Sequence, residues 1–175
     1  LASEPEDLIG RHVEVVLRDI TGDFSHEKYK LWFRIFKVEG ERAYARFSRE
    51  MLSYDYVRSL VQRRSSRVDV MTEGTTKDGH YVRVFNLIVT AMRVRHSQER
   101  AIRRRVHEYM SQVIPQLTLE QLVRASVLGD EPDINQQVRR IATKIAPIKN
   151  ADVRKIVILR RAEDEGSTPS SGEGG

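Results

Sequence analysis

Residues 93–113 have the sequence RVRHSQERAIRRRVHEYMSQV, which combines a dense arginine cluster with an apolar pattern of helical period. Six arginines and a single acidic residue lie between Arg93 and Arg105. Ser97 is suited to cap the start of a helix, because its hydroxyl can accept from a free backbone N–H, and Pro115 limits the far end. The predicted apolar face consists of Ile102, Val106, Tyr109, Met110 and Val113. The segment therefore predicts an amphipathic helix that packs on a core and presents arginine outward.

The outward side of this predicted helix has two interpretations. Surface helices commonly balance arginine with glutamate three or four residues away, and acids are nearly absent here. We therefore favour contact with a nucleic acid over a solvated face. The residues opposite the apolar face are Arg100, Arg104, His107 and Ser111, with Arg103 and Arg105 beside them.

The preceding segment, 68–90, has the pattern of a β-hairpin. Apolar and polar residues alternate on both sides of Asp78-Gly79, a dipeptide favoured in two-residue hairpin turns. The second strand is apolar on both faces, which is typical of a central strand. Gly74, inside the first strand, predicts a β-bulge.

Four further strands are predicted, at residues 11–18, 29–38, 43–47 and 153–159. Trp32, the only tryptophan, lies within the segment 29–38, which is rich in aromatic and β-branched residues. We interpret Trp32 as a core residue rather than as a surface on which a base stacks.

Three more helices carry N-cap signals. Ser53 begins the first, Thr118 and Gln121 form a capping box at the second, and Asp133 begins the third. The predicted apolar stripe of the third helix is Ile134, Val138, Ile141 and Ile145. The order of elements predicts an α+β fold, with a mostly antiparallel sheet, open or barrel-like, flanked by amphipathic helices.

A second arginine cluster surrounds the helix that Ser53 begins. Basic residues near a helix C-terminus favour the helix dipole, so part of this cluster has a structural explanation. Four arginines without an acid exceed that need, and we favour contact with RNA. They are Arg58, Arg63, Arg64 and Arg67, on the outer and C-terminal part of the predicted helix.

The length of 175 residues suits one domain, which we expect to span residues 10–161. A flexible acidic N-terminus, 1–9, and a disordered acidic tail, 162–175, are expected to flank it. Residues 10–161 hold all 30 basic residues and 18 of the 25 acidic ones, a net charge of +12. This balance predicts a polyanionic partner, and no apolar face rich in Trp or Phe adjoins the basic segments to suggest a membrane surface. Because the chain starts without methionine, we expect a trimmed or internal start.

No catalytic motif is present. The chain has no cysteine, and no two of its five histidines have the i,i+4 spacing of a helical metal site. The glycine-rich phosphate loops GxGxxG and GxxxxGK and the nucleophile motif GxSxG are also absent. We expect no cofactor, no metal, no small-molecule substrate and no enzymatic activity.

Several segments, in order, resemble one protein family. They are GRHVEV at 10–15, DYVRSLVQRR at 55–64, RVDV at 67–70, TKDGHYVR at 76–83, IRRR at 102–105, IAPI at 145–148 and VRKI at 153–156. Together they are similar to the S3Ae family of archaeal and eukaryotic ribosomal proteins, over about residues 8–161. The resemblance implies a structural protein of the cytoplasmic small ribosomal subunit. It also implies binding to ribosomal RNA on the platform, near the messenger exit, beside neighbouring ribosomal proteins. Members usually carry a basic, aromatic N-terminal extension, where this chain has an acidic stretch.

Phosphate neutralisation and shape recognition are the expected roles of the basic residues, because A-form RNA hides its base edges in a deep, narrow groove. The main alternative is a non-catalytic adaptor that docks translation factors. A metal-free nuclease is the third and least favoured class. The predicted RNA-binding residues are Arg58, Arg63, Arg64, Arg67, Arg83, Arg100, Arg103, Arg104, Arg105, Arg154 and Lys155.

Overall fold

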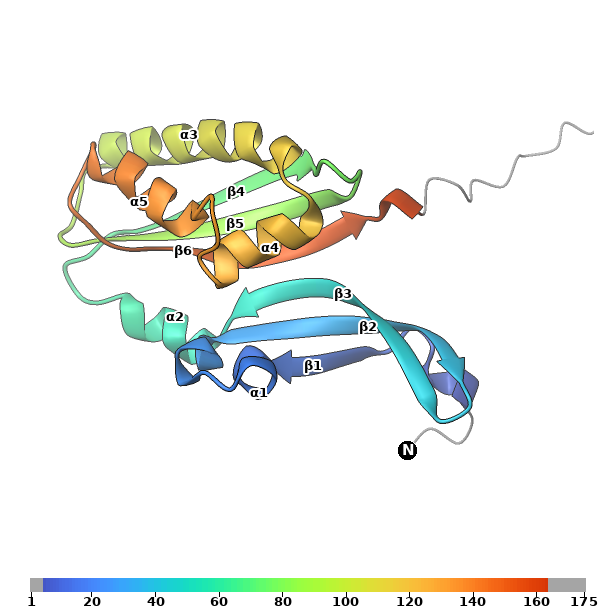
Figure 1. Cartoon of the computed structure of the whole chain (residues 1–175). Coiled ribbons are helices and arrows are strands. Elements are labelled where there is room, and N and C mark those ends of the chain that lie inside the picture. The colour runs from blue at the N-terminus through green and yellow to red at the C-terminus, as the bar shows by residue number, and fades with distance from the viewer. Residues whose placement is uncertain (1–4, 164–175) are drawn as a thin grey trace, which may run out of the picture.

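The computed structural model describes residues 5–163 and contains one six-stranded antiparallel sheet with the strand order β1-β2-β3-β6-β5-β4 (Figure 1). The predicted α+β fold with an antiparallel sheet is confirmed. The sheet is open, with β1 and β4 at its edges, and β5 is central as predicted. The strands are β1 His12–Val16, β2 Tyr29–Glu39, β3 Arg42–Leu52, β4 Arg67–Thr75, β5 Tyr81–Thr90 and β6 Ile148–Arg160.

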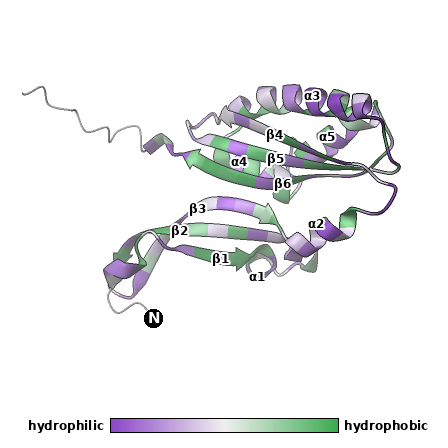
Figure 2. Cartoon of the chain, turned by 180° about the vertical axis from the view of Figure 1, so that it is seen from behind, coloured by the Kyte–Doolittle hydropathy of each residue, from purple (hydrophilic) through white to green (hydrophobic). Residues whose placement is uncertain are grey.

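The sheet has two parts, β1–β3 and β4–β6, and within residues 5–163 the strand pairing that joins them is that of β3 with β6 (Figure 1). This junction joins Arg49, Glu50 and Met51 of β3 to three residues of β6. Its short length lets the two parts of the sheet diverge beyond it. Figures 1 and 2 show α3, α4 and α5 together on one face of β4–β6. The helices are α1 Leu17–Thr21, α2 Tyr54–Leu60, α3 His96–Val113, α4 Leu119–Val127 and α5 Ile134–Thr143, and the 3-10 helices are η1 Pro5–Leu8, η2 Phe24–Lys28 and η3 Ile114–Gln116.

The main core lies between the sheet and α3–α5. Ile102, Val106 and Met110 of α3 are fully buried, as the helical period predicts. They belong to one cluster with the apolar residues of β4 and β5 that alternate toward the helices. A second cluster includes Leu52, Val57 of α2, and Leu87 with its neighbour Val89, so α2 packs against one end of β5.

The helix caps explain why each helix starts where it does. Ser53, Thr118 and Asp133 each accept from the backbone N–H three residues on, at 3.3, 3.3 and 3.0 Å, as predicted. The predicted Ser97 cap is wrong. Helix α3 starts one residue before it, at His96, because the Gln98 side chain instead accepts from the Arg95 N–H at 3.0 Å.

Two local predictions about strands need correction. Strand β1 stops at Val16, and Leu17, which is buried in the second cluster, begins α1. The β4–β5 ladder passes Gly74 without a register shift, so no bulge exists there. A side chain at Gly74 would approach Ile114 to 3.1 Å, and this close contact accounts for the glycine.

The remaining corrections concern one turn and one helix. The Thr76 N–H donates to the His80 carbonyl at 2.8 Å, so the β4–β5 turn has three residues rather than two. On α5 the fully buried positions are Ile134, Val138 and Ala142. Ile134 and Val138 of the predicted stripe are thus confirmed as core residues, and Ile141 and Ile145 are partly buried and pack against the same core. Ala142, which the prediction did not include, is the third fully buried position. The predicted burial of Trp32 is confirmed, at 8% exposure.

Both chain ends contact the domain within the described residues. The backbone N–H of Gly10, just beyond η1, donates to the Ile35 carbonyl at 2.8 Å. At the other end, the Ala162 N–H donates to His80 Nδ1 at 3.3 Å, and Glu163 forms an ion pair with Arg46. The rest of the two predicted terminal segments, 1–4 and 164–175, lies outside the described residues.

Candidate nucleic-acid interface

The structure distributes the eleven predicted RNA-binding residues over three surfaces rather than one. The first surface, here called the arginine ridge, is on α3 and holds Arg100, Arg103, Arg104 and Arg105. The second, on α2 and the loop after it, holds Arg58, Arg63 and Arg64. The third, on the sheet, holds Arg67, Arg83, Arg154 and Lys155.

The arginine ridge carries positive charge that acids neutralise only in part. Arg103 lies 3.8 Å from Glu99, and Arg105 lies 3.9 Å from Glu108. Arg100 and Arg104 are exposed and have no ion pair within residues 5–163. His107 is exposed on the same side, as predicted, and its Nδ1 lies 3.1 Å from the Thr72 hydroxyl of β4. The helical period therefore placed these residues on the exposed side of α3, and their contact with RNA stays a prediction.

The second surface differs from its prediction in backbone structure. Helix α2 ends at Leu60, so only Arg58 lies in its last turn and interacts favourably with the helix dipole. Arg63 and Arg64 belong to the following loop, where Arg64 adopts a left-handed conformation with φ of 73°. Arg67 lies in β4 rather than beside the helix. These arginines are exposed. The loop ends at Ser66, whose hydroxyl accepts from the Val94 N–H at 3.2 Å, two residues before α3.

The third surface is the face of the sheet opposite α3–α5, here called the open face. Residues directly opposite one another on paired strands share a face. Thr72, which contacts α3, is in register with Val84 and Ile156, so that row faces the helices. The two adjoining rows therefore define the open face. They are Lys30, Met51, Lys155, Phe85 and Met71, and Trp32, Arg49, Val157, Arg83 and Glu73.

Acidic side chains hold several basic residues of the open face in place. Asp69 accepts from Arg67 Nε at 2.7 Å and lies 3.6 Å from Arg154. Glu73 accepts from Arg83 Nε and from the Tyr81 hydroxyl, both at 2.6 Å. These hydrogen bonds lower the pKa of the Glu73 carboxyl, so it stays ionised. The basic side chains are thus oriented on the surface before any ligand binds.

The open face also places a cation over each aromatic ring that it carries. The Arg49 guanidinium lies 4.4 Å from the centre of the Trp32 ring. Phe85 has Arg154 and Lys155 at 5.6 and 5.8 Å, and Tyr81 has Arg160 at 5.9 Å. The residues predicted from the sequence as members of a candidate site did not include Lys30, Arg49, Tyr81, Phe85 and Arg160.

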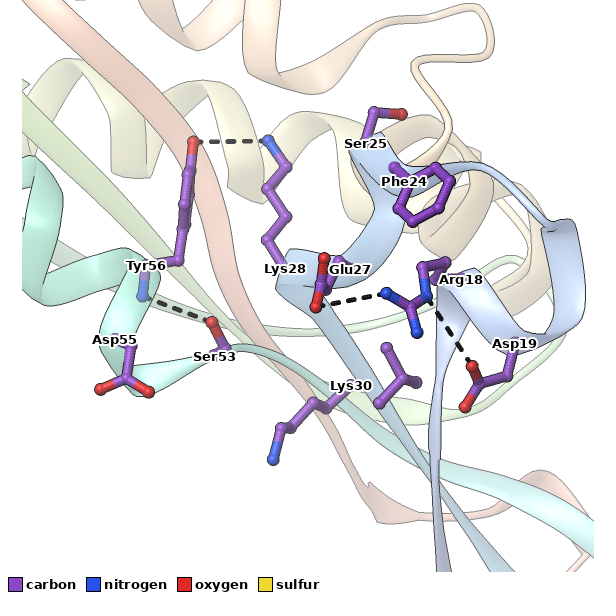
Figure 3. Close-up of a pocket in the computed structure, with 11 residues that line it drawn as sticks. Arg18, Asp19, Phe24, Ser25, Glu27, Lys28, Lys30, Ser53, Asp55 and Tyr56 are labelled. Carbon is purple, nitrogen blue, oxygen red and sulfur yellow. Dashed lines mark hydrogen bonds and ion pairs between the residues drawn. The ribbon is translucent and has the colours of Figure 1, made fainter.

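A hollow of about 590 Å³ lies beside β1 and β2, between η2 and α2 (Figure 3). Lys28 reaches across it to the Tyr56 hydroxyl at 3.4 Å, and Lys30, a member of the open face, also lines it. Arg18 is held by Glu27 at 3.4 Å and by Asp19 at 4.0 Å. Since the acids balance the bases here, the hollow adds little net positive charge.

Two other kinds of site find no support in the described part of the chain. Among residues 5–163, no three His, Cys, Asp or Glu side chains gather where they could hold a metal ion. Within the same residues, no helix combines the length and apolar character that a bilayer-spanning segment needs.

Comparison with known proteins agrees with the basic surfaces. The profile of the Ribosomal S3Ae family matches residues 1–162. A protein named small ribosomal subunit protein eS1 from Desulfurococcus amylolyticus is 38% identical over 169 residues, which cover 97% of this chain and 78% of the relative. Proteins of the same name from Methanopyrus kandleri and Staphylothermus marinus are 38% and 37% identical, covering 90% and 97% of this chain and 75% and 78% of the relatives. The chain therefore belongs to the ribosomal S3Ae family.

Proposed function

We propose that this protein binds ribosomal RNA on the platform of the small ribosomal subunit, near the messenger exit and beside neighbouring ribosomal proteins. Its role is structural and non-enzymatic, within the cytoplasmic ribosome, in keeping with its membership of a ribosomal protein family. The observation that carries RNA binding is the arginine ridge, where Arg100 and Arg104 are exposed and unneutralised among the described residues. The binding unit is the domain of residues 10–161.

The ridge suits the backbone of folded RNA. Guanidinium groups donate two parallel hydrogen bonds to phosphate, and the side chains on one helix face can follow a row of phosphates. Arg103 and Arg105 add charge at the edges, although their acidic neighbours reduce it. A-form RNA presents its phosphates and 2′-hydroxyls rather than its base edges. We therefore expect the ridge to contact the RNA backbone and not to read the bases. Binding there depends on charge and shape.

We expect the affinity for small-subunit RNA fragments to fall steeply with salt. If about six phosphates are neutralised, the slope of log K against log salt is about −4 to −5. Fluorescence anisotropy titrations over a range of potassium chloride concentrations measure this slope. A flat response would contradict an interface built on phosphate contacts.

The substitution Arg104→Glu should weaken RNA binding without unfolding the protein. Loss of one phosphate contact makes the salt slope shallower by about one unit, and the new carboxylate repels the same phosphate. Exposed substitutions usually change the free energy of unfolding by less than about 0.5 kcal/mol. Arg42→Glu is the matched control, because Arg42 is exposed at the β2–β3 hairpin and the net charge changes equally. Equal losses in both variants would show that overall charge acts, not the ridge.

A role as an adaptor that docks translation factors is the second candidate. It is favoured by an apolar groove of about 310 Å³ between α4 and the β2–β3 strands. Such a groove suits a protein side chain better than a phosphate. Co-sedimentation with ribonuclease-treated and intact small subunits separates the candidates, since an adaptor bound only through protein would survive the treatment. The groove is lined by Leu31, Phe33, Phe47, Leu119, Glu120, Val123 and Arg124.

A further inference from the structure

We infer that the open face binds single-stranded RNA, with Phe85 and Tyr81 stacking on unpaired bases. This inference rests on the proposed RNA-binding function and goes beyond it, because it names a second surface and a different form of RNA. The arginine ridge lies on the helix side of the sheet, and the open face lies on the other side. The two surfaces can therefore hold different segments of RNA.

The placement of the rings on β5 is the first support. Tyr81 and Phe85 are four residues apart on one face of a strand, about 13 Å, with Arg83 between them on the same face. Leu87, the next residue on that face, is buried in the second cluster with α2. The apolar packing of this face therefore ends at Leu87. Tyr81 and Phe85 are left partly exposed, with no helix over them in the described residues.

The charges around the rings are the second support. Arg154 and Lys155 lie over Phe85, and Arg160 lies over Tyr81, all within 6 Å of a ring centre. A base that stacks on either ring would have its phosphate close to one of these cations. Surfaces that bind single-stranded nucleic acid combine these two features, aromatic rings for the bases and basic side chains for the backbone.

The net charge of the open face selects RNA over a neutral protein. An apolar partner would strip water from basic groups and leave them without new hydrogen bonds, which is costly. Seven basic side chains stand on or beside the two rows and four acidic ones oppose them. They are Lys30, Arg49, Arg67, Arg83, Arg154, Lys155 and Arg160, against Glu14, Asp69, Glu73 and Asp152.

Unpaired bases, rather than a duplex, fit this surface. In a duplex the faces of the bases are stacked on one another and only edges, sugars and phosphates are accessible. Rings that lie nearly flush in a sheet cannot enter a groove, but they can receive a base that is splayed out of the strand. The prominent ridge of α3 is better shaped for a duplex backbone. The structure thus separates a stacking surface from a phosphate-binding ridge.

The test compares Phe85→Leu, Phe85→Trp and the unchanged protein, each as the full chain. The probes are a 12-nucleotide single strand of mixed sequence and a hairpin whose stem is a duplex and whose loop is a linker without bases. Phe85→Leu should weaken single-strand binding by roughly 5- to 150-fold, the range expected for loss of one stacked base. Phe85→Trp should retain it, and hairpin binding should stay the same in all variants. A 2-aminopurine in the single strand should be quenched on binding to the unchanged protein and to Phe85→Trp, but not to Phe85→Leu.

Two further variants guard the interpretation. Phe36→Leu is the matched control, since Phe36 is an exposed ring with Arg46 at 4.0 Å but lies near the β2–β3 hairpin, off the two rows. Tyr81→Leu repeats the test at the second ring if Phe85→Leu melts early. Unchanged single-strand affinity in folded Phe85→Leu and Tyr81→Leu would overturn the inference. Competition by poly-glutamate as strong as that by unlabelled single-stranded RNA would also overturn it, because it would indicate an acidic protein partner. If neither RNA binds the unchanged protein, the proposed function itself fails.

Discussion

Glu50→Gln will stabilise the protein by an amount that grows as the pH rises from about 4.5 to about 8. Glu50 is fully buried on β3, and neither carboxyl oxygen has a hydrogen-bond partner among the described residues. Burial raises the pKa of this carboxyl from 4.5 to about 8, and the charge of Asp152 adds to the shift. The Ile156 backbone N–H opposes the shift, although it makes no hydrogen bond of normal geometry with either carboxyl oxygen. The folded protein therefore holds Glu50 protonated at neutral pH.

The sign of the effect follows from the two protonation states. Below about pH 4.5 the carboxyl is protonated in the folded and unfolded chains alike, so its titration does not change the free energy of unfolding. Between about pH 4.5 and 8 the unfolded chain releases the proton and the folded chain keeps it, so stability falls as the pH rises. At about 1.4 kcal/mol per pKa unit, the full loss is on the order of 5 kcal/mol. Glutamine does not titrate and removes this loss.

Urea unfolding of both proteins at pH 5, 6, 7 and 8 measures the effect. The difference in the free energy of unfolding should widen by several kcal/mol across this range. Glu41→Gln, exposed in the β2–β3 turn, should follow the unchanged protein. If the Glu50→Gln curve runs parallel to that of the unchanged protein, the folded state must hold Glu50 ionised and hydrated.

The position of Glu50 gives this titration a structural consequence. Glu50 is paired with Ile156 in the middle of the junction between β3 and β6, which among residues 5–163 is the only strand pairing that joins the two parts of the sheet. An ionised carboxylate there would have to draw in water or move outward. Alkaline pH should therefore loosen the junction first. Hydrogen exchange of the Ile156 and Met51 amides would report it.

The elements that could be predicted from sequence are those specified by local patterns. Periodicity within about twenty residues predicts the hairpin of β4 and β5 and the buried face of α3. Three helix starts are predicted by capping side chains, each of which accepts from the backbone N–H three residues on. These caps are Ser53, Thr118 and Asp133. The arginine ridge was predictable for the same reason, because one helical period determines which residues share a face.

The open face could not be predicted, because it depends on pairing between distant strands. Met51 and Lys155 are neighbours only because β6 returns between β3 and β5. Lys28, Lys30 and Trp32 do alternate in the sequence, which was the available signal for one edge of this surface. The burial of Glu50 could not be predicted either. Its carboxyl lies on the core side of β3, and no local sequence pattern distinguishes it from an exposed glutamate.

The second large effect concerns α5, where Ile134→Ala should cost about 2–5 kcal/mol of unfolding free energy. Ile134 is fully buried within the main core, so the smaller side chain leaves a cavity that its neighbours cannot fill. Ile141→Ala is the matched control, because it is the same chemical change on the same helix. Ile141 is only partly buried, at the rim of the groove between α3 and α5, and should lose much less.

The pair of variants also tests the orientation of α5. If α5 were turned so that Ile141 faced the core, as its stripe of isoleucines first suggests, the two costs would be reversed. Guanidinium unfolding with equal m values in both variants makes the comparison direct. RNA affinity should be unchanged in both, because neither side chain lies on the arginine ridge or the open face. A loss of RNA binding by folded Ile141→Ala would instead place the groove beside Lys144 and Arg105 within the RNA interface.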